Sequence, residues 1–221
     1  MKKIEMEIPL QSVTLKGSMA IPDQATGIVI FSNGSGSNIS NTRIKFLAEF
    51  IQQKNIGTLV FDLLTEAEDE IYENRYNIDL LVSRLIQITE WLMQNKHTKE
   101  LPIGYFASGT GAAAAMRAAA YFGKTIKAVV SRGGRPDMVI NTLNQVLSPT
   151  LLIVGGIDVP IIGMNKMAFD ELQSVKEMKI IPKATQLFKE PGKLQEAAEL
   201  AISWFKRYFL QQNKEASLRY E

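Results

Sequence analysis

The chain has 221 residues, 46% of them hydrophobic, which is enough apolar material for a large core in one domain. Lys and Arg number 25 against 23 Asp and Glu, and the net charge of +2 gives no electrostatic reason to expect nucleic acid or an anionic membrane as a partner. The absence of cysteine excludes disulfides, thiolate catalysis and Cys-ligated zinc. The amino terminus alternates charged and apolar residues, unlike a signal peptide, and no apolar run reaches membrane-spanning length, so we expect a cytoplasmic protein.

The order of the predicted elements indicates an α/β fold. Residues 3–9 and 12–21 alternate apolar and polar side chains, which predicts an antiparallel pair at the edge of a sheet. Apolar runs and helical patterns then alternate along the chain, which predicts a mainly parallel, twisted sheet with helices on both faces, in one domain over 1–221. Strands are expected over 27–32, 57–62, 102–107, 126–131, 150–155 and 177–182. Helices are expected over about 40–54, 78–95, 137–146, 163–174 and 194–210, with a further helix of small residues after the strand 102–107 and a frayed tail from Gln211.

An acidic run lies between the second buried strand and the following helix. Thr65 and Glu68 have the spacing of a capping box, so the run from Glu66 to Glu73 is expected to open a short helix. Clustered carboxylates on a surface helix are usually solvated rather than bound to metal, so no metal site is predicted here, and no cofactor is expected.

The glycine-rich turn after the strand 102–107 matches two motifs. A nucleophile elbow, G-x-S-x-G, places its serine in a strained turn flanked by small residues, and Ala107-Ser108-Gly109-Thr110-Gly111 fits that pattern with glycine at the nucleophile position. The dinucleotide fingerprint G-x-G-x-x-G/A is matched by the six residues from Gly109 to Ala114. Either motif would place the functional site at this turn.

The exit of the strand 126–131 carries two arginines. Asp137 follows a proline and is expected to cap the helix 137–146. Arg132 and Arg135 either face an anionic ligand or are simply solvated, and the sequence leaves both interpretations open.

Four strand-exit loops, over 33–38, 107–111, 155–158 and 183–188, should lie along one edge of the sheet, because the strands before them are predicted to be parallel. Over nearly the whole chain the sequence resembles the small, lidless dienelactone-hydrolase-like α/β hydrolases, which implies an α/β-hydrolase fold and an ester or lactone as ligand. The resemblance is carried by Asn33-Gly-Ser-Gly-Ser37, Phe61-Asp-Leu-Leu-Thr65, Ile103-Gly-Tyr-Phe106 with Thr110-Gly-Ala-Ala-Ala-Ala115, Ser131-Arg-Gly-Gly-Arg-Pro-Asp137, Leu152-Ile-Val-Gly-Gly156 with Asp158, and Leu187-Phe188 before Glu190-Pro-Gly192.

Departures from the family pattern fall on the positions that carry chemistry. Gly109 stands where the family has its serine, Gln186 where it has its histidine, and Asn33-Gly34 where it has a His-Gly pair; of the triad, only the acid Asp158 remains. Without a base a hydroxyl nucleophile is not activated, so hydrolysis is expected to be lost.

A binding pocket for a small ester, lactone or anionic ligand is expected to survive this loss. Backbone N–H groups of Ser35 and Thr110 would form an anion-accepting hole at the start of a helix. Ligand contacts are expected from Asn33, Gly34, Ser35, Thr110, Arg132 and Arg135. The sequence does not predict an oligomeric state.

Two other functions stay open. An unorthodox hydrolase could use Ser108 or Ser35 as its nucleophile, but the one histidine, His97, precedes the strand 102–107 and should lie about 20 Å away, at the opposite end of the sheet. A nucleotide-binding protein could use Gly109, Gly111 and Ala114. It lacks the acidic ribose ligand expected about 20 residues further on, so only a 2′-phosphorylated cofactor met by Arg132 would suit.

Overall fold

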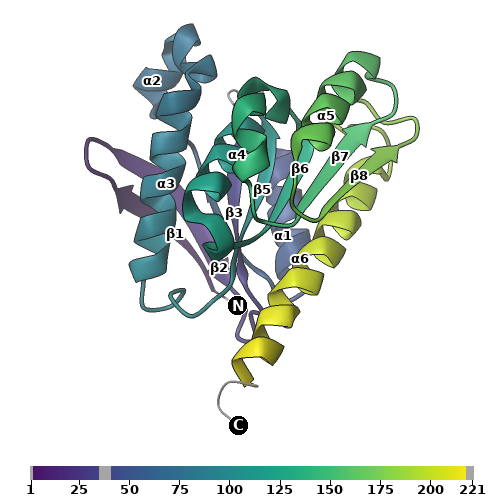
Figure 1. The fold of residues 1–221 in the computed structure, drawn as a ribbon. Helices are drawn as coiled ribbons and strands as arrows, with labels where there is room; N and C mark the ends of the chain where they lie inside the picture. Colours follow the sequence, from purple (N-terminus) through teal and green to yellow (C-terminus); the bar gives the residue numbers. More distant parts are fainter. Residues whose placement is uncertain (1, 35–40, 218–221) are drawn as a thin grey trace.

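A computed structural model describes residues 2–34 and 41–217 of the chain. Within these residues eight strands form one sheet in the order β1-β2-β4-β3-β5-β6-β7-β8 (Figure 1). The hairpin β1–β2 is antiparallel and joins β4 antiparallel, whereas β4, β3, β5, β6, β7 and β8 run parallel, as the sequence predicts. The strands are β1 (Lys2–Pro9), β2 (Thr14–Ile21), β3 (Ile28–Asn33), β4 (Gly57–Phe61), β5 (Ile103–Gly109), β6 (Ile126–Gly134), β7 (Thr150–Gly155) and β8 (Lys176–Ile181).

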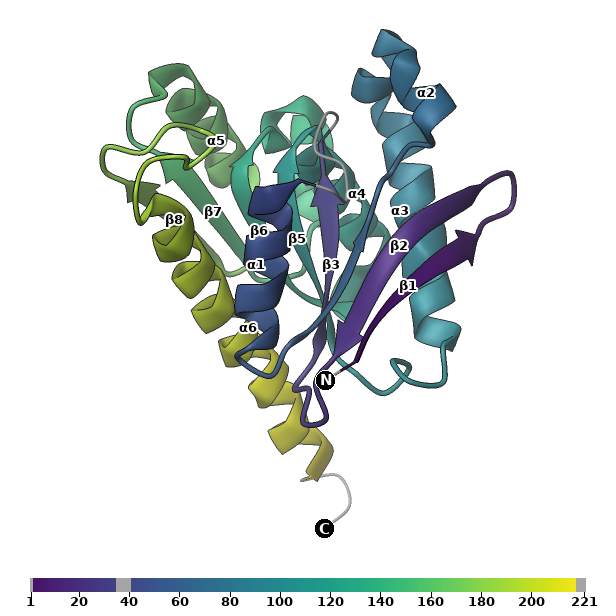
Figure 2. The same cartoon turned by 180° about the vertical axis from the view of Figure 1, so that it is seen from behind.

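Helices cover both faces of the sheet. One face carries α3, α4 and α5, and the other carries α1 and α6, which Figure 2 shows in front of the strands. The helices are α1 (Thr42–Gln52), α2 (Glu66–Glu70), α3 (Ile78–Gln94), α4 (Thr110–Phe122), α5 (Val159–Glu171) and α6 (Lys193–Ser217), with 3₁₀ turns η1 (Tyr72–Tyr76), η2 (Gly123–Thr125) and η3 (Pro136–Gln145). None of the helices in the described part of the chain is long and apolar enough to cross a membrane.

The central strands are apolar throughout because each contributes to two cores. In β3, Ile28 and Ile30 pack toward α3 and α4, while Val29 and Phe31 pack toward α1 and α6. Successive side chains of a strand point to opposite faces, so a strand covered on both faces needs a continuous apolar run. The alanines of α4 are small enough to bring that helix close to the strands beneath it, and all of those from Ala112 to Ala115 are fully buried.

Helix boundaries differ from the sequence-based expectation at three places. Residues 136–145 form the 3₁₀ segment η3, interrupted at Val139 (φ −128°), and Asp137 does not cap it because its carboxylate binds the Arg135 guanidinium. The helix α5 begins at Val159 rather than near residue 163, directly after Asp158, with Pro160 in its first turn. The helix α6 continues to Ser217 instead of fraying from Gln211, since the residues there are mostly good helix formers.

A partly buried ion pair fixes the acidic segment against the sheet edge. The capping box forms as predicted: the Thr65 hydroxyl accepts from the Glu68 backbone N–H at 3.2 Å, and the Glu68 carboxylate accepts from the Thr65 backbone N–H at 2.9 Å. The other oxygen of Glu68 binds the buried Arg84 guanidinium at 2.6 Å, and Arg84 donates in turn to Ser12 at 3.0 Å. One carboxylate therefore connects α2, α3 and the turn of the first hairpin.

The substitution Glu68→Gln should destabilise the fold at neutral pH by about 1–3 kcal/mol, because it leaves the buried Arg84 charge without its partner. Burial by itself raises the pKa of the Glu68 carboxyl, but hydrogen bonds from Thr65 and Arg84 outweigh burial and hold this pKa below its usual range. The stabilisation by the Glu68 carboxylate is therefore fully present at a pH above its unfolded-state pKa of about 4.3. This stabilisation is lost as the pH falls through the lower, folded-state pKa.

Urea unfolding from pH 7 down to pH 3 measures this effect. The wild-type advantage over Glu68→Gln should shrink across the acidic end of that range. The control is Glu66→Gln, since Glu66 pairs with Lys16 in full solvent and should change stability little. A difference between wild type and Glu68→Gln that does not depend on pH would contradict this account.

Candidate functional site

The carboxyl ends of β3, β5, β6, β7 and β8 meet at one edge of the sheet, and the loops that follow them are bound to one another. The Gly34 N–H donates to the Ser108 carbonyl at 2.8 Å, which joins the loop after β3 to the end of β5. The Arg135 N–H donates to the Gly109 carbonyl at 2.9 Å, and the Ile157 N–H donates to the Ala184 carbonyl at 3.0 Å. The structure thus brings the predicted exit loops together, except that Ser35 and the rest of 35–40 lie outside the described residues.

The turn between β5 and α4 has left-handed backbone at Gly109, with φ 55° and ψ −137°. This is the conformation that glycine adopts freely and that other residues adopt at a cost of about 1–3 kcal/mol. A Cβ atom at this position would lie 3.5 Å from the Gly34 Cα, which is ordinary contact, so the space would accept a side chain. The strained position of the turn is therefore residue 109 and not Ser108.

Gly111 has a different role in the same turn. A Cβ atom there would lie 2.2 Å from the Ser32 carbonyl oxygen, so no side chain fits between α4 and the end of β3. The Ser32 hydroxyl also donates to the Gly111 carbonyl at 2.8 Å. Glycine is therefore required at residue 111 for α4 to pack closely on β3. This packing explains the second glycine of the dinucleotide fingerprint without any need for a bound nucleotide.

Ser108 lies one residue before the strained position and is only 8% exposed. Its hydroxyl donates to the Asn33 side-chain oxygen at 3.2 Å. An amide is not a base, so this contact orients the hydroxyl without activating it. The single histidine, His97, follows α3 and is exposed, and its backbone N–H donates to the Asn95 side chain at 3.0 Å. Because it precedes β5, it lies at the opposite end of the sheet, as the sequence predicts.

Asp158 and Gln186 meet across the loops after β7 and β8. The Asp158 carboxylate accepts a hydrogen bond from the Gln186 backbone N–H, and the Gln186 side-chain amide donates to the Gly133 carbonyl at 3.0 Å. Gly133, with φ 54°, leaves no room for a side chain, because a Cβ atom would lie 2.5 Å from the Gln186 carbonyl oxygen. The side-chain amide of Gln186 is therefore held at the end of β6, while the backbone of Gln186 binds the Asp158 carboxylate.

The two arginines after β6 have different environments. Arg135 forms a two-pronged ion pair with Asp137, with bonds of 2.8 and 2.9 Å, and the hydrogen bonds from this carboxylate raise the pKa of the Arg135 guanidinium. Arg132 is 6% exposed, donates weakly to the Leu187 carbonyl at 3.4 Å and lies over the Phe188 ring at 5.3 Å. Arg132 makes no ion pair with any of the described residues. Of these two arginines, Arg135 is therefore neutralised by a carboxylate and Arg132 is not.

Buried polar atoms without a hydrogen-bond partner gather at this edge. Eight such atoms occur among the described residues, and five of them belong to the strand ends and loops of this edge: Asn33 Nδ2, Thr110 Oγ1, Ser131 Oγ, Arg132 Nε and Thr185 Oγ1. Such atoms in a folded protein usually meet ordered water or a ligand. Ser131 and Thr185 were not singled out from the sequence, and the only signal that could have found them is their place at strand ends.

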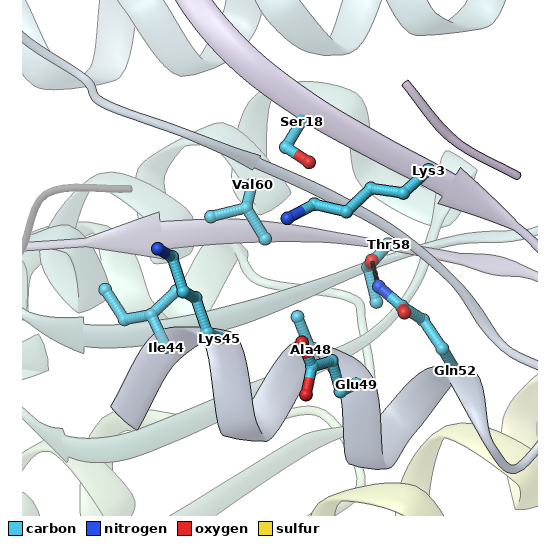
Figure 3. Close-up of a pocket in the computed structure, with 9 residues that line it drawn as sticks. All are labelled: Lys3, Ser18, Ile44, Lys45, Ala48, Glu49, Gln52, Thr58 and Val60. Carbon is cyan, nitrogen blue, oxygen red and sulfur yellow. Dashed lines mark hydrogen bonds between the residues drawn. The ribbon is translucent and has the colours of Figure 1, made fainter. Parts of the chain in front are cut away.

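A small pocket lies away from this edge, between α1 and the strands β2 and β4 (Figure 3). Its volume of about 20 Å³ suits roughly one water molecule, and across it the Gln52 side chain donates to the Thr58 hydroxyl at 2.7 Å. A group of three or more acidic or histidine side chains able to hold a metal does not occur within the described ranges.

Known proteins resemble this chain in sequence and in structure. A dienelactone hydrolase from Anabaena variabilis is 47% identical, with a TM-score of 0.91, over 94% of this chain and 98% of that one. Two esterases share the fold at low identity. They are Est1E from Butyrivibrio proteoclasticus (13%, TM-score 0.79, covering 94% of this chain and 99% of that one) and Pf2001 from Pyrococcus furiosus (18%, TM-score 0.72, covering 94% and 93%).

Curated relatives from two strains of Mycobacterium tuberculosis, provisionally named phosphoribosyl transferases, are 42% identical over 201 residues. This match covers 91% of the chain but only 45% of the relatives' own length. No protein-family profile matches the chain.

The two helical glycines Gly111 and Gly163 should respond in opposite ways to alanine. Gly111→Ala should destabilise the protein by about 1–3 kcal/mol, because the new methyl group meets the Ser32 carbonyl. Gly163→Ala in α5 has open space around the new methyl group and should stabilise by about 0.5–1 kcal/mol. Thermal unfolding of both variants checks this; a Gly111→Ala protein as stable as wild type would contradict the packing described for the turn.

Proposed function

The chain belongs to the dienelactone-hydrolase-like α/β hydrolases, and we propose that its Ser–His–Asp site is degenerate, so that it binds a small ester, lactone or anionic ligand without hydrolysing it at enzymatic rates. The observation that carries the proposal is the strained turn. In this fold the nucleophile occupies the strained residue between strand and helix, and here the positive φ falls on Gly109, which has no side chain to react.

The position of the base supports the same conclusion. Gln186 follows β8, where the triad of this fold has its histidine, and its backbone N–H donates to the Asp158 carboxylate. Its amide cannot take a proton from a nucleophile, and it is already engaged with the Gly133 carbonyl. We propose that Asp158 is a remnant acid that now holds the loop after β8 in place.

What remains of the site suits binding. The Thr110 N–H lies in the first turn of α4, where backbone donors lack partners within the helix and attract negative charge. We propose that it forms one half of an oxyanion hole, with Ser35 as the other half, and that Asn33 and Gly34 contribute to the same pocket. The orphaned polar atoms around it are the groups that a polar ligand would satisfy.

The other two functions explain less of the geometry. A nucleophilic Ser108 would be paired with an amide, in a buried position before the strained residue. A nucleotide site would need Gly109 and Gly111 for a pyrophosphate, yet both glycines have a structural reason in the turn itself. The phosphoribosyl transferase name belongs to relatives more than twice as long as the matched stretch, which here has the fold of hydrolases.

The chain is proposed to act as one domain. Its lack of cysteine agrees with a reducing compartment, which we propose is the cytoplasm. The charge balance supports a small-molecule ligand rather than nucleic acid or a membrane surface.

Restoring the triad tests the proposal. Wild-type protein should hydrolyse activated esters and lactones no faster than an oxyanion hole alone permits, roughly 10³–10⁴-fold over water. Gly109→Ser and Gln186→His should each gain little, because the serine lacks a base and the imidazole has nothing to activate. The double variant should gain more than the product of the two single gains, since triad members act as a unit.

The matched control adds Asp158→Asn to the double variant, which should remove most of the gain. Steady-state kinetics with p-nitrophenyl acetate and a five-membered lactone measure these rates. Ordinary enzymatic turnover by wild type, abolished by Ser108→Ala, would contradict the proposal, because the nucleophile would then be Ser108.

Nicotinamide cofactors should not bind. NADPH should leave the melting temperature unchanged, although a ligand at 100 times its dissociation constant would stabilise by about 2.7 kcal/mol. Differential scanning fluorimetry with and without NADPH gives the answer. A clear shift that disappears in Arg132→Ala would support the nucleotide-binding alternative instead.

A further inference from the structure

Arg132 is a buried cation without a counter-ion among the described residues. It extends from the end of β6 onto the face that carries α1 and α6, the same face as Val130 two residues earlier. Its contacts are one long hydrogen bond to the Leu187 carbonyl and the face of the Phe188 ring, and its Nε has no partner. A buried charge in such surroundings costs free energy of desolvation unless an anion pairs with it.

The neighbouring chain cannot supply that anion from the segment after β3. Residues 35–40 read Ser-Gly-Ser-Asn-Ile-Ser and contain no acidic side chain. The carboxylate nearest to Arg132 in the sequence is that of Asp137 in η3, and Arg135 already binds it. Within the part of the chain that the structure describes, no ion pair joins a carboxylate to Arg132, and a bound anion would supply the missing counter-ion.

A second arginine, Arg43 in α1, acts electrostatically on Arg132. Burial is the main cause that lowers the pKa of Arg132 to about 10, and the positive charge of Arg43 contributes to the same shift, so the two guanidinium groups repel each other. Arg43 is half-buried in the first turn of α1, and its backbone N–H donates to the Asn41 side chain at 3.0 Å. That turn contains no acidic residue, so the positive end of the helix dipole is also uncompensated there.

We propose that Arg132, Arg43 and the amino end of α1 form a binding subsite for the phosphoryl group of a small molecule. Two guanidinium groups carry a charge of +2, and a phosphate monoester carries about −1.5 to −2 near neutral pH. A carboxylate would neutralise only one of them and leave the repulsion in place. Arg132 and Arg43 also offer the planar donors that suit phosphate oxygens.

This inference rests on the proposed function in one respect, because it names the class of ligand bound at the same edge of the sheet. The phosphoryl group would lie on the α1 face, next to the loop of Leu187 and Phe188, and the rest of the ligand would extend toward Gln186 and the turn at Gly109. The subsite does not require the ligand to be hydrolysed.

Isothermal titration calorimetry with inorganic phosphate tests the subsite, with acetate and potassium chloride as comparisons at equal ionic strength. Phosphate should bind wild type at millimolar or lower concentration, and acetate should bind at least tenfold more weakly. Arg43→Gln should weaken phosphate binding at least tenfold. The matched control is Lys45→Gln, which removes the same charge from an exposed side chain two residues further along α1 and should change binding less than twofold.

Arg132→Met provides the second measurement. This variant lacks the unpaired buried charge, so without phosphate its melting temperature should equal or exceed that of wild type. Adding phosphate should not raise the melting temperature of the variant. If Arg132→Met does not fold, Arg132→Lys, which keeps the charge but loses the planar fork, should fold and bind phosphate more weakly.

Absence of phosphate binding by wild type, or equal weakening by Arg43→Gln and Lys45→Gln, would overturn the subsite. Failure of the subsite and failure of the proposed function are distinguishable. Ester turnover by wild type would overturn the degenerate triad while leaving phosphate binding intact. An inert protein that does not bind phosphate would overturn only the subsite.

Discussion

The close approach of two backbone segments, residues 32–34 and 109–111, is the constraint on which the site depends. The loop after β3 is bound to the end of β5, and α4 begins against the last residues of β3 with no space for a side chain at residue 111. Between the end of β5 and the start of α4 the chain turns at residue 109, where φ is positive. The same turn that would strain a nucleophilic serine is relaxed with glycine. In the proposed function, glycine in place of serine at residue 109 both removes the nucleophile and relieves this strain.

The central strands could be predicted from sequence because burial on both faces imposes continuous apolar runs, as from Ile28 to Phe31. The capping box at Thr65 and Glu68 was also predicted, since it depends on residues three positions apart. Asp137 shows where such local reasoning fails. Its place after a proline is typical of a helix start, but the guanidinium of Arg135 binds the carboxylate and a 3₁₀ segment forms instead.

The environment of Arg132 could not be predicted for a related reason. The pattern of an arginine followed by glycines at a strand exit fits a solvated side chain and a ligand contact equally well. Its burial results from Leu187 and Phe188, which are 55 or more residues away along the chain. The same holds for the orphaned hydroxyls of Ser131 and Thr185, which meet the site only through the topology of the sheet. Long-range packing, and not the local pattern, decides which of these polar groups are available to a ligand.

The central claim is that the site has no activated nucleophile, and reaction with a fluorophosphonate followed by intact-protein mass spectrometry tests it most directly. Such a reagent modifies the serine of an assembled triad and needs no knowledge of the natural ligand. The account predicts no adduct on wild-type protein and one adduct, at residue 109, on the Gly109→Ser, Gln186→His double variant. A stoichiometric adduct on wild type, located at Ser108 by peptide mapping, would contradict it.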